Sequence, residues 1–238
     1  MSMYADGTFG RERKRMNSFH LKLIAIITML IDHIGAIMLP HDTMLYLILR
    51  CIGRLAFPIF VFLLIEGFQH TRNVQKYLIR LGVFALISEV PFDFAFYGTV
   101  LEFSHQNIFF TLFLGLMCIY LMREIEKKYK LNFIILNIIY ALLTLIFGVA
   151  AFYLKTDYGY KGLLLIVAFY IFRNSKLLLT CSLFFISGYL LKYINVYATI
   201  AMIPIAFYNG QKGKSIKYIF YIFYPAHLLV LAFIHRLL

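Results

Sequence analysis

Ionisable side chains lie inside several of the long apolar stretches of this sequence. Asp32 and His33 are adjacent in ITMLIDHIGAIMLP, residues 27–40, and Arg50 and Arg54 are one helical turn apart in the next apolar stretch. If these stretches cross a membrane, each charge at the bilayer centre costs about 2.5–3.5 kcal/mol on insertion scales, so a cluster indicates a site shielded from lipid. Later apolar stretches add four polar residues to the cluster: Ser88, Glu89, Asp93 and His227.

These residue types suit acyl transfer. A buried histidine beside carboxylates is a common general acid–base arrangement, and nearby arginines can stabilise the oxyanion of a tetrahedral intermediate. Proton-coupled transport uses similar groups, because chains of Asp, Glu and His relay protons through membranes. The residues alone leave both functions open. A structural alternative also remains, in which Asp32 or Glu89 neutralises Arg54 and fixes helix packing.

Two other chemistries have less support. No nucleophile-elbow pattern surrounds Ser88, which argues against Ser-His-Asp hydrolysis. The two histidines of the cluster and Asp32 lack the spacing of a metal-ligand motif, so we predict no metal site. Each cysteine lies in an apolar stretch, where we expect it to pack as a small buried hydrophobe. The cysteines are Cys51, Cys118 and Cys181.

A second polar group follows the second apolar stretch, in EGFQHTR. Glu66 and His70 are one helical turn apart, and three basic residues follow: Arg72, Lys76 and Arg80. Basic residues are common at the cytoplasmic ends of membrane helices whatever their function. The alternative is a binding place for an anionic cytosolic ligand, since arginine suits phosphate.

The composition is that of a polytopic membrane protein. Of the 238 residues, 62% are hydrophobic and 14% are charged, whereas a soluble domain carries roughly a quarter charged residues. A spanning helix needs about 20 apolar residues, and we predict an all-α bundle of about nine spans, within a range of seven to nine. The predicted spans are 19–39, 44–69, 76–97, 107–122, 131–154, 160–172, 177–193, 196–208 and 217–236.

The positions of the basic residues predict the orientation. With the N-terminus in the cytoplasm, most of the 23 Lys and Arg residues fall at cytoplasmic helix ends. The net charge of +12 is therefore attributed to topology, and we predict no nucleic-acid partner. This orientation places the Asp–His–Arg cluster in the outer half of the membrane and the EGFQHTR group at its cytoplasmic face.

The chain divides into a short tail and one membrane domain. Residues 1–18 are predicted to form a flexible basic tail, and residues 19–238 a single transmembrane domain. Small residues at helix faces allow close packing, within one subunit or between subunits. The candidates are Gly35, Gly53 and Gly115.

Three segments resemble the TraX family of membrane acetyltransferases. They are LKLIAIITMLIDHIGAIMLP, LRCIGRLAFPIFVFLLIEGFQHTRNVQKYLIRLGVFALISEVPFD and FYIFYPAHLLVL. The family is named for the enzyme that acetylates the N-terminal amine of F-type conjugative pilin. Residues 105–210 resemble it mainly in hydrophobicity and in the number of helices.

The resemblance implies a multi-pass enzyme of the cytoplasmic membrane that uses acetyl-CoA as cosubstrate. It also implies kinship with larger acyltransferases that move an acetyl group outward across the membrane, in which a histidine near the first helix is central. That position corresponds to His33 here, which would receive the acetyl group or activate the acceptor, with Asp32 or Glu89 fixing its tautomer. Arg50 or Arg54 would stabilise the oxyanion. A second candidate for the base or for positioning the acceptor is His227.

The resemblance also assigns the two substrates to opposite faces. The CoA phosphates would bind the inner group, whose members are Glu66, His70, Arg72, Lys76 and Arg80. The expected acceptor is the N-terminal amine of a pilin or another secreted peptide. Alternatives are a glycan hydroxyl or a lipid-linked intermediate, and a proton-coupled transporter remains the rival class.

Overall fold

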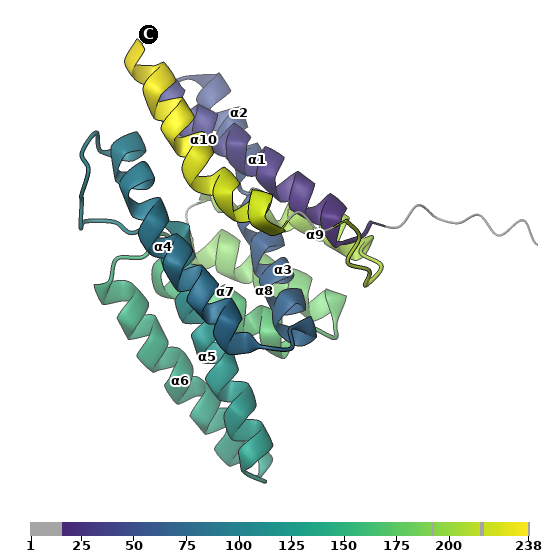
Figure 1. Ribbon diagram of the computed structural model, residues 1–238. Coiled ribbons are helices and arrows are strands. Elements are labelled where there is room, and N and C mark those ends of the chain that lie inside the picture. Colours follow the sequence, from purple (N-terminus) through teal and green to yellow (C-terminus); the bar gives the residue numbers. More distant parts are fainter. Residues whose placement is uncertain (1–15, 192, 215–216, 238) are drawn as a thin grey trace, which may run out of the picture.

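The computed structural model describes residues 16–191, 193–214 and 217–237. Within these ranges the chain is helical, with two isolated β-bridges and no strand (Figure 1). The predicted all-α fold is therefore confirmed. Residues 1–15, which form most of the predicted tail, lie outside the described residues.

Each predicted span coincides with one or two helical elements. Five helical segments in the described part of the chain are long and apolar enough to cross a membrane: Ser18–Met38, Met44–His70, Ile108–Lys128, Phe133–Tyr153 and Ile219–Leu237. The total of about nine spans and their orientation remain predictions. The elements are α1 (Ser18–Met38), α2 (Met44–Gly53), α3 (Ala56–His70), α4 (Val74–Phe96), α5 (Ile108–Lys128), α6 (Phe133–Tyr153), α7 (Gly159–Ile171), α8 (Lys176–Phe185), the π-helix η1 (Ile186–Leu190), the 3₁₀-helix η2 (Tyr193–Ala201), α9 (Met202–Ala206) and α10 (Lys217–Leu237).

Polar residues mark where many of these helices begin. Asn17 accepts hydrogen bonds from the backbone N–H groups of Phe19 and His20, and the His20 ring accepts one from the Asn17 N–H. This reciprocal cap satisfies donors that the first helical turn leaves unpaired. Single side-chain caps of the same kind start five further helices: Thr43, Asn73, Asn107, Asn132 and Ser175.

The second predicted span is interrupted in its middle. Helix α2 ends at Gly53, a turn follows at Arg54 and Leu55, and α3 begins at Ala56. The cause is Pro58, because its ring nitrogen cannot donate to the carbonyl four residues earlier. That carbonyl belongs to Arg54, so the break falls at the residue whose side chain enters the candidate site.

The core lies among α1, α3, α5, α7 and α10, and α6 covers its edge (Figure 1). Only three described residues of α6 are buried: Phe147, Gly148 and Ala151. The cysteine prediction holds for Cys118, which is buried, but Cys181 is exposed. An apolar stretch in a membrane helix includes lipid-facing positions, so apolar context alone does not predict burial.

The small residues singled out in the sequence pack inside the subunit. A Cβ atom added at Gly115 would lie 2.3 Å from Ile166, and one at Gly35 would lie 3.0 Å from Leu49. Gly53 meets Asp32 in the same way. These glycines therefore allow close approach between helices of one chain rather than between subunits.

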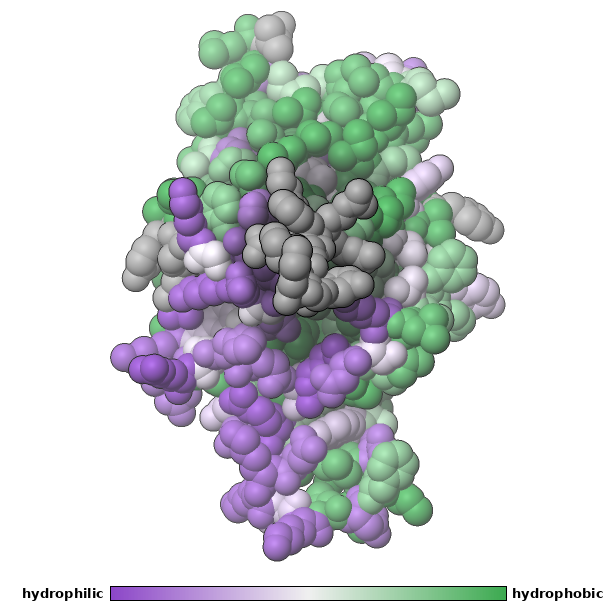
Figure 2. Space-filling model, turned by 90° about the vertical axis from the view of Figure 1, so that its right-hand side faces the viewer, coloured by the Kyte–Doolittle hydropathy of each residue, from purple (hydrophilic) through white to green (hydrophobic). Residues whose placement is uncertain are grey.

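The bundle has two distinct ends. We call the end at which α1 and α4 begin the basic end. There the Met16 N–H donates to the Phe207 carbonyl, and the Ser18 N–H donates to the Gln211 carbonyl. We call the opposite end, at which α4 ends, the loop end. The connections 97–107 and 154–158 lie together there. Figure 2 shows hydrophilic residues gathered on the middle and lower part of one face, below a hydrophobic upper part.

Candidate active site

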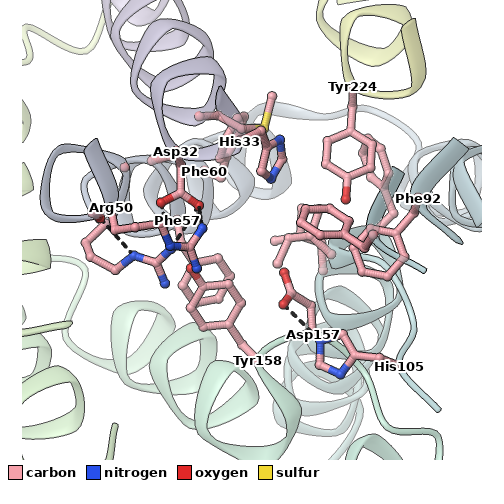
Figure 3. Close-up of a pocket in the computed structure, with 18 of the residues that line it drawn as sticks. Asp32, His33, Arg50, Phe57, Phe60, Phe92, His105, Asp157, Tyr158 and Tyr224 are labelled. Atoms are coloured by element: carbon pink, nitrogen blue, oxygen red, sulfur yellow. Dashed lines mark hydrogen bonds and ion pairs between the residues drawn. The ribbon is translucent and has the colours of Figure 1, made fainter. Parts of the chain in front are cut away.

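A polar cavity of about 280 Å³ opens near the loop end. Its walls come from α1, α2, α3, α4, α5 and α10, from the turn between α2 and α3, and from the two connections at that end. Figure 3 shows side chains from these elements directed into one space. The polar residues and tyrosines that line it are Asp32, His33, Arg50, Arg54, Tyr97, His105, Asp157, Tyr158 and Tyr224.

Asp32 holds both arginines of the second span. Its Oδ2 lies 2.7 Å from Arg50 Nη1, and its Oδ1 lies 2.7 Å from Arg54 Nη2. The carboxylate is buried, and helix α2 approaches it at Gly53, where an added Cβ would lie 2.1 Å from Asp32 Oδ1. A buried charge needs such partners, because the interior does not replace its hydration. The group carries a net positive charge of one toward the cavity.

The two arginines differ in the number of hydrogen bonds that their guanidinium groups donate. Arg54 donates to Asp32 and through Nε to the Arg50 carbonyl, and its Nη1 lies 3.4 Å from Asn195 Oδ1. Arg50 makes one hydrogen bond, through Nη1, within the described part of the chain. Arg50 therefore keeps donors for an oxyanion, whereas Arg54 mainly holds Asp32 in place.

His33 and His227 form a stacked and hydrogen-bonded pair. His33 Nδ1 lies 2.6 Å from His227 Nε2, and the ring planes differ by 8°. On the far side of the second ring, His227 Nδ1 lies 2.7 Å from the Phe223 carbonyl oxygen, which can only accept. His227 must therefore carry its proton on Nδ1, and His33 donates from Nδ1 to His227 Nε2. This tautomer leaves His33 Nε2 as a lone pair.

The expectation that Asp32 or Glu89 fixes the His33 tautomer is wrong. Asp32 bonds the arginines, and the Glu89 carboxylate accepts from the side chain of Asn107, the N-cap of α5. Asp93 likewise accepts from the Glu102 N–H at 2.8 Å. The carboxylates of α4 thus hold the start of α5 and the loop that precedes it. The Ser88 hydroxyl is fully buried and has no hydrogen-bond partner among the described residues.

The cavity contains a pair of residues that the sequence reasoning missed. His105 Nε2 lies 3.2 Å from Asp157 Oδ1, and the two residues are 52 positions apart (Figure 3). The hydrogen bond to Asp157 is the main reason that the pKa of His105 lies above its ordinary value. Both residues are in short connections between apolar stretches, and polar loop residues of this kind are a signal for binding.

A second, basic cavity of about 580 Å³ lies at the basic end. Four residues of the predicted cofactor group line it, and Lys76 does not, because it is exposed on the outside of α4. The four are Glu66, His70, Arg72 and Arg80. Two further cations, Lys22 and Lys212, also line it. They come from the start of α1 and from the connection before α10, which sequence reasoning did not place beside α3.

The polar and basic cavities adjoin. Four apolar side chains line both of them: Phe60, Phe109, Leu112 and Phe220. Phe60 and Phe220 face each other with ring centroids 5.2 Å apart. These side chains therefore form part of the wall that the two cavities share.

Comparison with known proteins identifies the family that the chain matches. The model of the TraX protein family matches residues 18–235. The chain is 31% identical to the probable fimbrial assembly protein FimC, serogroup H1, of Dichelobacter nodosus, over 90% of this chain and 94% of that protein. It is 32% identical to the uncharacterized protein RP591 of Rickettsia prowazekii (strain Madrid E), over 47% of this chain and 40% of that protein. No solved structure matches.

Proposed function

The chain belongs to the TraX family, and from this premise we propose that it is a membrane acetyltransferase. It moves an acetyl group from cytosolic acetyl-CoA to an acceptor at the opposite face of the cytoplasmic membrane. The observation that carries this proposal is the proton arrangement of the histidine pair, which leaves a lone pair on His33 Nε2. His33 and Arg50 line the same cavity, and that cavity adjoins a basic one.

The basic cavity suits the donor. CoA carries several phosphate charges, and four cations line this cavity: Lys22, Arg72, Arg80 and Lys212. Arg80 lines the cavity, and its buried Nε lacks an acceptor among the described residues, which leaves the guanidinium group incompletely paired. Acetyl-CoA supplies the acyl thioester when bound. Its acyl end must pass between the side chains that the two cavities share to reach His33.

The polar cavity suits the transfer itself. His33 Nε2 takes a proton from the acceptor or receives the acetyl group, and His227 holds the ring in the required tautomer. Arg50 stabilises the negative charge that develops on the carbonyl oxygen. Asp32 holds Arg50 and Arg54 and keeps the cavity from carrying two unneutralised cations.

The proposed acceptor is the N-terminal amine of a pilin or another secreted peptide. The support is that one relative is named a probable fimbrial assembly protein. The excess of basic residues at the basic end supports the orientation with that end in the cytoplasm. Acceptors would then approach from the loop end.

The test is acetyl transfer by purified protein in proteoliposomes supplied with radiolabelled acetyl-CoA and candidate peptide or glycan acceptors. His33→Ala should abolish the labelled product, because Nε2 is the proposed base or acyl acceptor. The matched control is His41→Ala, since His41 is an exposed histidine just after α1 that lines neither cavity.

Thermal unfolding should be similar for both variants and the wild type. Undiminished transfer by His33→Ala would remove this residue from the mechanism. Proton-coupled flux without any acyl donor, together with no acetylated product, would favour the transporter instead.

A further inference from the structure

The polar cavity has a second polar wall that the proposed transfer does not yet use. Asp157 and His105 lie on it, at the loop end of the cavity (Figure 3). We propose that these two residues form the acceptor site, in which Asp157 binds a protonated primary amine and His105 takes a proton from it. This inference rests on the proposed function and names the residues that bind its acceptor amine.

The charges in the cavity favour Asp157 as the binding residue. The lining contains two carboxylates among the described residues, Asp32 and Asp157. Asp32 is neutralised by two guanidinium groups, whereas the partner of Asp157 is an imidazole, which is neutral above its pKa. The Asp157 side chain is 33% exposed, so a ligand can reach it. A carboxylate that no guanidinium group neutralises attracts a compact cation such as an ammonium group in a partly buried cavity.

The surrounding backbone holds the pair in position. The Gln106 N–H donates to the Lys155 carbonyl at 2.9 Å, which joins the two connections next to His105 and Asp157. Lys155 itself has a φ of 52°, a left-handed conformation that the turn after α6 requires. Thr156 is buried, and its N–H donates to the Ala151 carbonyl. The site is therefore built before any acceptor arrives.

The properties of His105 favour an α-amine over other nucleophiles. The hydrogen bond to Asp157 raises the pKa of His105, and Glu89 on α4 acts in the same direction. An N-terminal amine has a pKa of about 7.7–8.0 and a lysine side chain about 10.4, so a histidine deprotonates the first far more readily. A sugar hydroxyl carries no positive charge and gains nothing from the Asp157 carboxylate.

The transfer balances with one acetyl thioester as donor. The ammonium gives one proton to His105, and the neutral nitrogen attacks the thioester carbonyl carbon. The new C–N bond forms, the C–S bond breaks, and the second proton leaves nitrogen through His33 to the departing thiolate. The products are an N-acetyl amide, a thiol and the proton that His105 returns to solvent.

A binding measurement tests the acceptor site without any transfer. Purified protein is titrated with a short peptide that has a free N-terminus and with the same peptide N-acetylated. The wild type should bind the free amine at least tenfold more tightly, and Asp157→Asn should abolish that difference. The control Asp42→Asn changes an exposed aspartate outside both cavities and should preserve it. Equal binding of the two peptides by the wild type would overturn the inference.

Transfer kinetics give the second readout. Asp157→Asn should raise the KM for the free-amine peptide at least tenfold and leave the KM for acetyl-CoA unchanged. His105→Gln should lower kcat/KM and remove the acidic limb of its pH profile. Unchanged KM in Asp157→Asn, or equal acetylation of an α-hydroxy analogue of the peptide by the wild type, would refute the acceptor site. Failure of the wild type to acetylate any acceptor would instead refute the proposed function.

Discussion

Replacing Gly53 by alanine should dismantle the arginine–aspartate group of the polar cavity. The added Cβ would lie 2.1 Å from Asp32 Oδ1 and 2.2 Å from Asp32 Cβ. Carbon atoms in contact are about 3.5–4.0 Å apart, so the Asp32 side chain must retreat by about 1 Å or more. Its hydrogen bonds of 2.7–2.8 Å to Arg50 and Arg54 would then exceed hydrogen-bonding distance.

The expected loss of stability depends on how the structure relaxes. Overpacking alone costs about 1–3 kcal/mol. Separating a buried ion pair costs about 3–5 kcal/mol, because each charge loses its partner without regaining water. We therefore expect Gly53→Ala to lower the free energy of unfolding by about 1–5 kcal/mol. Acetyl transfer should also fall sharply, since Arg50 would lose its position.

Reversible unfolding in mixed detergent micelles measures the free energy, and labelled acetyl-CoA measures transfer. The matched control is Gly148→Ala in α6, where an added Cβ meets nothing closer than 3.6 Å. That variant should be neutral or slightly stabilising, because alanine is a better helix former than glycine. If Gly53→Ala unfolds like Gly148→Ala and transfers normally, the contact between α2 and Asp32 is not as described.

Two further predictions concern the basic cavity and the acceptor pair. Arg80→Ala should raise the KM for acetyl-CoA roughly tenfold or more, since a hydrogen bond to a charged group contributes about 1.5–3 kcal/mol, whereas Lys76→Ala should leave it unchanged. Equal KM values in both variants would refute the phosphate assignment. Because the folded pKa of His105 is raised, its pairing with Asp157 stabilises the fold fully below about pH 6.5 and loses this contribution as pH rises through the folded value. The stability difference between wild type and His105→Gln should therefore be largest in acid and shrink in alkali, and a constant difference in pH-dependent unfolding would contradict it.

Local properties of the chain explain why so much of the fold could be predicted. Long apolar stretches must form helices in a membrane, because every backbone polar group needs an internal partner. Polar caps such as Asn17 and the ring of Pro58 set helix boundaries through bonds that are local in sequence. The one-turn spacing of Arg50 and Arg54 likewise placed both guanidinium groups on one side, where the nearby Asp32 carboxylate binds them.

Pairings between distant segments could not be predicted in the same way. His33 and His227 are 194 positions apart, and His105 and Asp157 are 52 apart. Glu89 was expected beside His33, but the rotation of α4 turns it toward Asn107. Periodicity shows which residues share a helix face, but not which neighbouring helix that face meets.

The amino-acid sequence alone determined the helices, the charged residues that cannot face lipid and the family resemblance. The tertiary structure decided the direction of the hydrogen bond between His33 and His227. It also decided that Arg50 rather than Arg54 keeps unused donors, and that Lys22 and Lys212 line the basic cavity. The physical reason is that hydropathy and capping act within a few residues of the chain. Hydrogen bonds between helices depend instead on the rotation and depth at which each helix packs, and these arise only when the whole bundle assembles.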